Sequence, residues 1–228
     1  VYDVFGSPRE ALNLYARAAD VYHRIADIRN EAVCLINLGH VRRQIGELKQ
    51  AEGDLRNAIS LCAENSDRMV GFVADEELGH VLTYEGRFTE ASRHLDAALE
   101  WCLESQRASK RFPKRKGLTR LCSPCVGYAT VQPHKSLAWR QSESLLRMYH
   151  ALLYLFRAEY ESALLQARHA LRLAVRDGNL WHVMYANSLC GSALMAMKQF
   201  AEAEKRISRS AELCRRAHNL EFEPRVLL

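Results

Sequence analysis

The chain has 228 residues, of which 48% are hydrophobic and 26% are charged, with a net charge of +5. No apolar run approaches the roughly 18–20 residues that span a bilayer, and the N-terminus lacks the basic start and apolar stretch of a secretory signal. The seven cysteines are an odd number and lie mostly in helical patterns, which argues against a disulfide framework. These features predict a cytoplasmic protein with no membrane partner.

The sequence repeats itself along most of its length. Leu-Gly-His occurs at residues 38–40 and again at 78–80, forty residues later. Copies that start at Ala32, Phe72, Ser144 and Met184 match at the same internal positions, and such self-similarity is the signature of a repeat architecture. Counted from each start, positions 7, 8, 15, 20, 24 and 27 hold Leu38, Gly39, Gly46, Ala51, Leu55 and Ala58, then Leu78, Gly79, Gly86, Ala91, Leu95 and Ala98. The third copy contributes Ala151, Ala158, Ala163, Ala167 and Ala170, and the fourth contributes Cys190, Gly191, Ala203, Ile207 and Ser210.

The repeated residue types indicate pairs of antiparallel helices. Small residues at positions 8, 20 and 27 let two helices approach closely, and larger apolar residues at 7 and 24 fill the space between neighbouring hairpins. A glycine near position 15 ends the first helix in a left-handed conformation. Cys62, Cys102 and Cys214 share position 31 and are predicted to be small core residues. The sequence therefore predicts an all-α solenoid of helix hairpins.

The repeats are predicted at residues 1–104 and 137–228, with an incomplete copy at each end. Val1 falls at position 10 of a copy, and Pro224 begins a new copy that stops after "PRVLL". Neither end has the polar capping helix with which repeat arrays normally finish. We therefore expect a piece of a longer array, with short natural termini as the alternative.

A basic insert at residues 105–136 is predicted to be a flexible loop. Prolines at 113, 124 and 133 and glycines at 117 and 127 break any helical pattern. Nine basic residues and no acid lie between residues 105 and 142, so the repeats themselves are mildly acidic. The loop either contacts nucleic acid or another anionic partner, or is solvated without one. Its first basic residues are Arg107, Lys110, Arg111, Lys114, Arg115, Lys116 and Arg120.

The repeat pattern resembles the tetratricopeptide repeat (TPR) family, which has Leu-Gly at positions 7 and 8 and alanines at 20 and 27. The period of forty differs from the family's usual value of about 34, and the proline expected near position 32 is absent. Forty-residue variants are similar to the sensor arrays of bacterial signal-transduction (STAND-type) ATPases. The resemblance implies a right-handed superhelix of hairpins, interrupted once by the basic loop.

The resemblance also implies a concave groove that binds proteins or peptides. In the family, positions 2, 5, 9, 12 and 13 of the first helix face this groove. The corresponding candidates are Ile36, His40, Arg43, Glu76, His80, Thr83, Tyr84, Met148, Leu152, Phe156, Tyr185 and Ser188. The lysine clamp that some members use for carboxylate tails is missing, because Val33 stands where that lysine would be.

No motif in the sequence indicates catalysis. The chain has no phosphate-binding loop, no His-Glu-x-x-His pair and no nucleophile elbow. Cys122 and Cys125 form a Cys-x-x-Cys pair, which is half of a zinc site, and only His134 lies nearby. We expect no enzyme, no cofactor and no metal, and predict a scaffold or sensor segment of a larger signalling protein. The alternative is a nucleic-acid-associated scaffold that uses residues 105–140.

Overall fold

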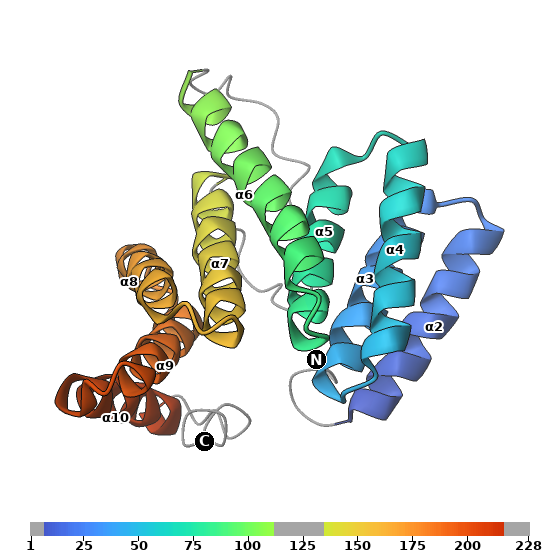
Figure 1. Cartoon of the computed structure of the whole chain (residues 1–228). Coiled ribbons are helices and arrows are strands. Elements are labelled where there is room, and N and C mark those ends of the chain that lie inside the picture. Colours follow the sequence, from blue (N-terminus) through green and yellow to red (C-terminus); the bar gives the residue numbers. More distant parts are fainter. Residues whose placement is uncertain (1–6, 112–134, 217–228) are drawn as a thin grey trace. The chain divides into compact units, whose positions relative to one another are not determined.

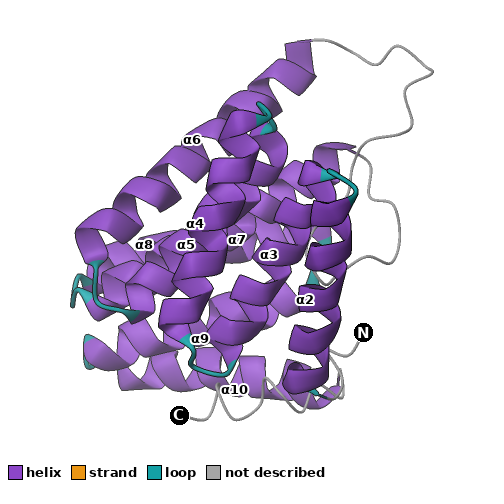
Figure 2. Cartoon of the chain, turned by 90° about the vertical axis from the view of Figure 1, so that its right-hand side faces the viewer, coloured by secondary structure: helices purple, strands orange, loops and turns teal. Residues whose placement is uncertain are grey.

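The computed structural model describes residues 7–111 and 135–216, with side chains described over 7–108 and 143–216. Every regular element within these ranges is an α-helix (Figure 2). None of these helices is both long and apolar enough to cross a bilayer. The predicted all-α class is therefore confirmed for the described part of the chain.

The described residues form two compact units that divide within one long helix, between Trp101 and Cys102. The first unit contains α2 (Pro8–Arg24), α3 (Ile28–Gln44), α4 (Leu48–Glu64), α5 (Arg68–Tyr84) and the start of α6 (Phe88–Arg111) (Figure 1). The second contains the end of α6, then α7 (Lys135–Phe156), α8 (Tyr160–Asp177), α9 (Leu180–Ala196) and α10 (Phe200–Arg216).

In each unit, successive helices pack on one another in chain order. In the first unit α2, α3, α4 and α5 form a consecutive series, and α3 also contacts α5. In the second unit α7, α8, α9 and α10 do the same, and α7 also contacts α9. The helices α3, α5, α7 and α9 begin the four sequence copies, so we call them first helices and call α4, α6, α8 and α10 second helices. Consecutive packing of this kind is the arrangement of an α solenoid.

The turns between these helices share one hydrogen-bond pattern. After α3, the Glu47 amide donates to the Arg42 carbonyl at 2.9 Å, and the Gly46 amide donates to the Arg43 carbonyl at 3.2 Å. This pair of bonds is the Schellman motif, which needs one left-handed residue. Gly46 and Gly86 fill that position with φ of 85° and 77°, as predicted. The same conformation also occurs without glycine, at Ala26, Ser66, Ala158 and Lys198.

A close contact between the two helices of a hairpin explains the repeated Leu-Gly. A Cβ atom added to Gly39 would lie 2.6 Å from Cγ of Leu55, and one added to Gly79 would lie 2.7 Å from Cγ of Leu95. The fourth copy repeats this contact, because a Cβ on Gly191 would lie 2.5 Å from Cγ1 of Ile207. Position 8 must therefore lack a side chain wherever position 24 holds a large one.

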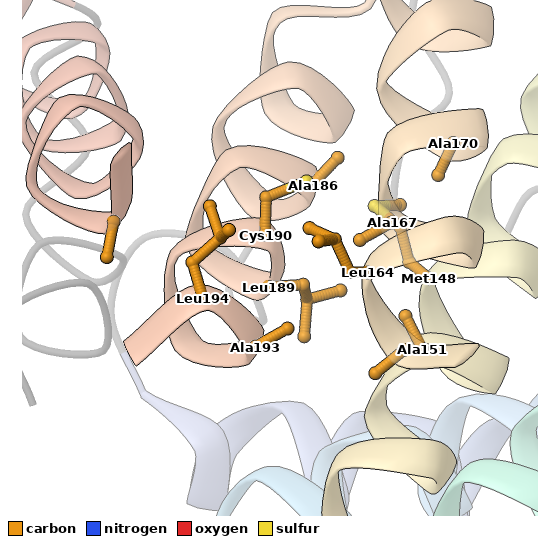
Figure 3. Packing of buried hydrophobic residues seen from close by; sticks show 12 residues of the cluster. Met148, Ala151, Leu164, Ala167, Ala170, Ala186, Leu189, Cys190, Ala193 and Leu194 are labelled. Atoms are coloured by element: carbon orange, nitrogen blue, oxygen red, sulfur yellow. The ribbon is translucent and has the colours of Figure 1, made fainter. Parts of the chain in front are cut away.

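The third copy solves the same packing problem with different residues. Ala151 takes position 8 and Ala167 takes position 24, so the smaller second residue leaves room for a methyl group on the first. Both alanines are fully buried in one apolar cluster with Met148, Leu189 and Leu194, to which α7, α8 and α9 contribute most residues and α10 contributes Ala203 (Figure 3). Packing therefore constrains the summed side-chain volume of positions 8 and 24, and not the volume at either position alone.

Replacing Gly79 with alanine should destabilise the protein, because the new methyl group meets Leu95 in a filled core. We expect a loss of about 1–3 kcal/mol in the free energy of unfolding. Gly53 is the matched control, since it lies mid-helix on α4 with nothing within 4 Å of an added Cβ. Gly53→Ala should stabilise by about 0.5–1 kcal/mol. Urea unfolding measures both values, and equal effects of the two variants would refute the packing argument.

Ala158→Gly should stabilise the protein, because Ala158 adopts a φ of 59° that a Cβ atom disfavours. We expect a gain of about 0.5–1 kcal/mol, which is the left-handed penalty less the extra entropy of glycine in the unfolded chain. Gly86→Ala is the reverse test, since nothing lies within 4 Å of an added Cβ there and only backbone strain opposes it. Thermal unfolding should show shifts of opposite sign in the two variants.

Candidate functional site

The predicted groove residues all lie on the four first helices, but their solvent exposures differ widely. Five of them are buried, and Tyr84 and Phe156 are 42% and 49% exposed. These two aromatic residues occupy the same repeat position, at the C-terminal ends of α5 and α7. The buried five are Ile36, Glu76, His80, Thr83 and Met148.

In the first unit, polar groups from α3 and α5 form a buried cluster around Glu77. The Oε1 atom of Glu77 lies 3.2 Å from Nδ1 of His40, and its Oε2 atom lies 3.4 Å from Nε of Arg43. We call His40, Arg43, Glu76, Glu77 and His80 the acid–histidine cluster. It joins two first helices through residues that are 37 positions apart in the sequence.

Both ring nitrogens of His40 have side-chain partners. The Gln44 side-chain amide lies 3.0 Å from Nε2. The Nδ1 atom lies 3.2 Å from Oε1 of Glu77 and 3.3 Å from Nη2 of Arg43. His40 is thus held by α3 on one side and by α5 on the other.

The two adjacent carboxyl groups of α5 have opposite protonation behaviour. Burial raises the pKa of Glu77, but the neighbouring His40 and Arg43 outweigh it and hold this pKa well below the ordinary value of 4.5. Burial and the neighbouring Glu77 charge both raise the pKa of Glu76 well above the same value. Glu77 is therefore an ionised acceptor, and Glu76 resists ionisation.

Glu76 is the residue of the cluster that the fold does not require. It is only 5% exposed, and none of the hydrogen bonds found among the described residues reaches its carboxyl group. Position 5 of the other copies holds Ile36, Met148 and Ser188. An apolar residue thus fits this place, and a carboxyl group there costs stability.

The other end of the cluster consists of the C-terminal turn of α5. The His80 and Tyr84 rings lie with centroids 5.1 Å apart, which places an exposed aromatic next to a buried imidazole. The Thr83 hydroxyl donates to the Gly79 carbonyl at 2.8 Å, so its polar atom is satisfied within the helix. Of these residues, Tyr84 offers the most exposed surface.

In the second unit, the equivalent positions are mainly apolar. Met148 belongs to the buried cluster of α7, α8 and α9, and Leu152 and Tyr185 are partly buried against that cluster. Ser188 is half-buried on α9. The candidate positions are therefore mainly polar in the first unit and mainly apolar in the second.

Most of the basic insert lies outside the described residues. Of the predicted basic residues, only Arg107 has a described side chain, and it is exposed on α6. Lys110 and Arg111 belong to the helical end of α6, where only the backbone is described. The remaining predicted residues of the insert are outside the description, namely Lys114, Arg115, Lys116, Arg120, Cys122 and Cys125.

The described cysteines are buried and form no disulfide with one another, and the shared register of Cys62, Cys102 and Cys214 predicted their burial. Cys62 and Cys214 lie near the ends of α4 and α10, Cys102 lies within α6, and Cys34 and Cys190 are buried in first helices. Burial raises the pKa of both Cys62 and Cys190 to about 11. Thiols with such pKa values are protonated at neutral pH and are poor nucleophiles.

Within residues 7–108 and 143–216, no group of three or more His, Cys, Asp or Glu side chains is placed to hold a metal ion. A scan against protein-family models finds no match for the chain, and a search of curated proteins finds no relative either. The candidate site therefore has to be judged on its own geometry.

Sequence reasoning missed Glu77, which is the centre of the acid–histidine cluster. Glu77 stands at repeat position 6, which is not a groove position in the family. The residue before it holds a groove position and the residue after it holds a packing position. No local sequence pattern therefore marks Glu77 as a buried polar residue. A histidine at the same position of two neighbouring copies, His40 and His80, was the one available signal, because an imidazole packed between helices calls for a nearby partner.

Glu76→Gln and Glu77→Gln should change stability in opposite directions. A carboxyl group with a raised folded-state pKa loses stability as pH rises above the unfolded value of 4.5. We therefore expect Glu76→Gln to stabilise at pH 7 by about 1–3 kcal/mol and to have little effect at pH 4. Glu77→Gln should destabilise at pH 7 by about 3 kcal/mol, because it removes the carboxylate that lies beside the buried Arg43 charge.

Urea unfolding between pH 4 and pH 8 measures both variants against the wild type. The stabilising effect of Glu76→Gln should grow as pH rises, since only the wild type must then ionise a buried carboxyl group. The effect of Glu77→Gln should shrink as pH falls, because the depressed pKa of Glu77 contributes stability only where the unfolded carboxyl is ionised. Parallel pH profiles for the two variants would refute these assignments.

Proposed function

We propose that the chain is a protein- or peptide-binding scaffold of the TPR type, and that it is the interaction or sensor segment of a larger signalling or regulatory protein. In this proposal the hairpins form a right-handed superhelix, and the partner binds along the first helices. Each hairpin of a solenoid contacts only its neighbours, and the resulting extended surfaces bind partners by helix-in-groove or extended-peptide modes.

The observation that carries this proposal is the burial of Glu76 without a hydrogen-bond partner for its carboxyl group among the described residues. A buried carboxyl group without a hydrogen bond lowers stability, and three other copies of the repeat show that the fold accepts Ile, Met or Ser at this position. Residues that cost stability and have strongly shifted pKa values are concentrated at functional sites. The partner that suits Glu76 is a basic side chain, because an ammonium or guanidinium group would stabilise the carboxylate form.

The exposed aromatic at the end of α5 supports the same surface. Tyr84 lies one helical turn after His80, and Phe156 has the same repeat position on α7. Aromatic side chains supply large contact areas at protein interfaces. A peptide with a basic residue beside apolar residues therefore matches the chemistry of α5.

A nucleic-acid-associated scaffold is the second candidate, because nine basic residues and no acid lie between residues 105 and 142. Binding of this kind would be steeply dependent on salt, with a slope of about 0.9 per neutralised phosphate on duplex DNA. It would also disappear on deletion of residues 112–134, whereas binding at the first helices would persist.

Selection of displayed peptides on the immobilised chain tests the proposed function. We expect enrichment of peptides that contain Lys or Arg next to apolar residues. Glu76→Gln should weaken the selected peptides by at least about 30-fold, as expected for the loss of one partner of a buried charge pair. Glu100→Gln is the matched control, since Glu100 is an exposed acid of the same unit on α6, and it should leave affinity unchanged.

Three results would count against the proposal. One is a failure to enrich any peptide family, and another is equal binding by the wild type and Glu76→Gln. The third is salt-dependent DNA binding that is lost on deletion of residues 112–134, because it would support the nucleic-acid scaffold instead.

A further inference from the structure

Helix α8 carries three arginines on one exposed face. Arg168, Arg172 and Arg176 follow one another at i, i+4 and i+8, and all three are exposed. Successive members are therefore about 6 Å apart along the helix axis. Leu165 and Val175 are 64% and 62% exposed, and they project within the same arc of about 100°.

Few acidic side chains among the described residues neutralise the charges of these arginines. None of the ion pairs among the described residues includes Arg168 or Arg172. Among the described residues, Arg176 forms an ion pair with its neighbour, with Nε lying 3.5 Å from Oδ1 of Asp177. The acid that shares their face is Glu161, two helical turns before Arg168.

In the first unit, an arginine at the repeat position of Arg168 is paired with two acids. Arg56 on α4 has the same repeat position as Arg168, and its Nη2 atom lies 2.9 Å from Glu52 and 2.6 Å from Glu90 of the next second helix. Arg168 has neither of these two acidic partners. Leu164 replaces the first, and Glu202, which corresponds to the second, pairs with Arg206 at 3.2 Å instead.

The remaining residues of this face also differ from those of α4. Where α8 has Leu165, Arg172, Val175 and Arg176, the corresponding residues of α4 are Gly53, Ser60, Ala63 and Glu64. The fold thus accepts small, polar or acidic residues at these positions, and packing does not require the arginines or the two branched side chains. Together they give α8 an exposed face that is both basic and apolar.

We propose that this face of α8, formed by Leu165, Arg168, Arg172, Val175 and Arg176, is a docking surface for an acidic helical segment of a partner protein. Carboxylates spaced at i, i+4 and i+8 on the partner match the spacing of the arginines, which favour carboxylates because of their planar donor geometry. Apolar side chains of the partner cover Leu165 and Val175. A phosphodiester backbone offers no such apolar side chains.

This surface goes beyond the proposed function, because it lies on a second helix of the second unit and not on the first helices that hold Glu76. The mixture of exposed arginine with exposed aliphatic residues is also typical of protein interfaces, where arginine is enriched and lysine is depleted. The two surfaces can therefore be tested independently with separate variants of the full chain.

Fluorescence anisotropy with a labelled synthetic peptide tests the docking surface. The probe is a helical peptide of about 16 residues with Glu at i, i+4 and i+8 and two leucines on the same face, spaced by helix geometry. At about 50 mM salt, where surface charges are weakly screened, Arg168→Gln/Arg172→Gln should bind about tenfold more weakly than the wild type. Leu165→Ser should weaken binding by about threefold.

Arg9→Gln/Arg17→Gln is the matched control, since it removes the same charge from two exposed arginines on one helix, α2. It should leave the peptide affinity within about twofold of wild type if binding depends on the α8 face and not on net charge. The Glu76→Gln variant should also bind this probe normally, which separates the docking surface from the proposed peptide site. Far-UV circular dichroism and thermal unfolding check that each variant folds as the wild type does.

Equal peptide binding by the wild type and Arg168→Gln/Arg172→Gln would overturn the proposal, as would equal loss in the α2 control. A third result would also overturn the proposal. It is that a DNA duplex of about 20 base pairs, or vesicles that contain phosphatidylserine, bind the wild type more tightly than the peptide does and bind the α8 variant more weakly. The face would then recognise phosphate groups rather than a protein. Loss of peptide binding in the α8 variants alone would support it.

Discussion

The contact between position 8 of a first helix and position 24 of the following second helix is the constraint on which the rest of the structure depends. In three copies a glycine admits Leu55, Leu95 or Ile207 so closely that a methyl group would clash. The third copy divides the same volume between two alanines. The two positions must change together, and this explains why Leu-Gly recurs while most neighbouring residues differ. The same helix pair brings position 8 close to the backbone of position 20, since a Cβ on Gly79 would lie 3.3 Å from the Ala91 carbonyl oxygen. Positions 20 and 27 hold small buried residues in all four copies.

The sequence was sufficient to predict the helical repeat because these constraints are local. A glycine at position 15 signals a left-handed turn, and a cysteine in constant register signals a core position. The same logic fails where another residue is forced into the glycine conformation, as at Ala158 and Lys198. There the two hydrogen bonds of the turn, rather than the residue type, determine the backbone.

The candidate site was predictable only in part, because burial and pairing depend on contacts between copies. The register placed His40 and Glu76 on first helices, but it could not show that Glu76 is buried beside a second carboxyl group. Nor could it show that Glu77 of α5 contacts both His40 and Arg43 of α3. The desolvation of buried ions offsets much of their attraction, but removal of one member costs about 3 kcal/mol because the other charge stays buried.

The repeat frame leaves two kinds of position free to vary, and the two units use them differently. In the first unit, Arg56 on α4 and Arg87 in the turn before α6 pair with Glu52 and Glu90, and these pairs lower the pKa of Glu52 to about 2 despite its partial burial. On α8, the repeat position of Arg56 carries Arg168, whose acidic partners have been replaced. Glu76 differs from the residues of the other copies without improving packing, whereas Arg168 keeps its residue type but has lost its acidic partners. For this reason we propose that Glu76 on a first helix and Arg168 on a second helix belong to two different binding surfaces.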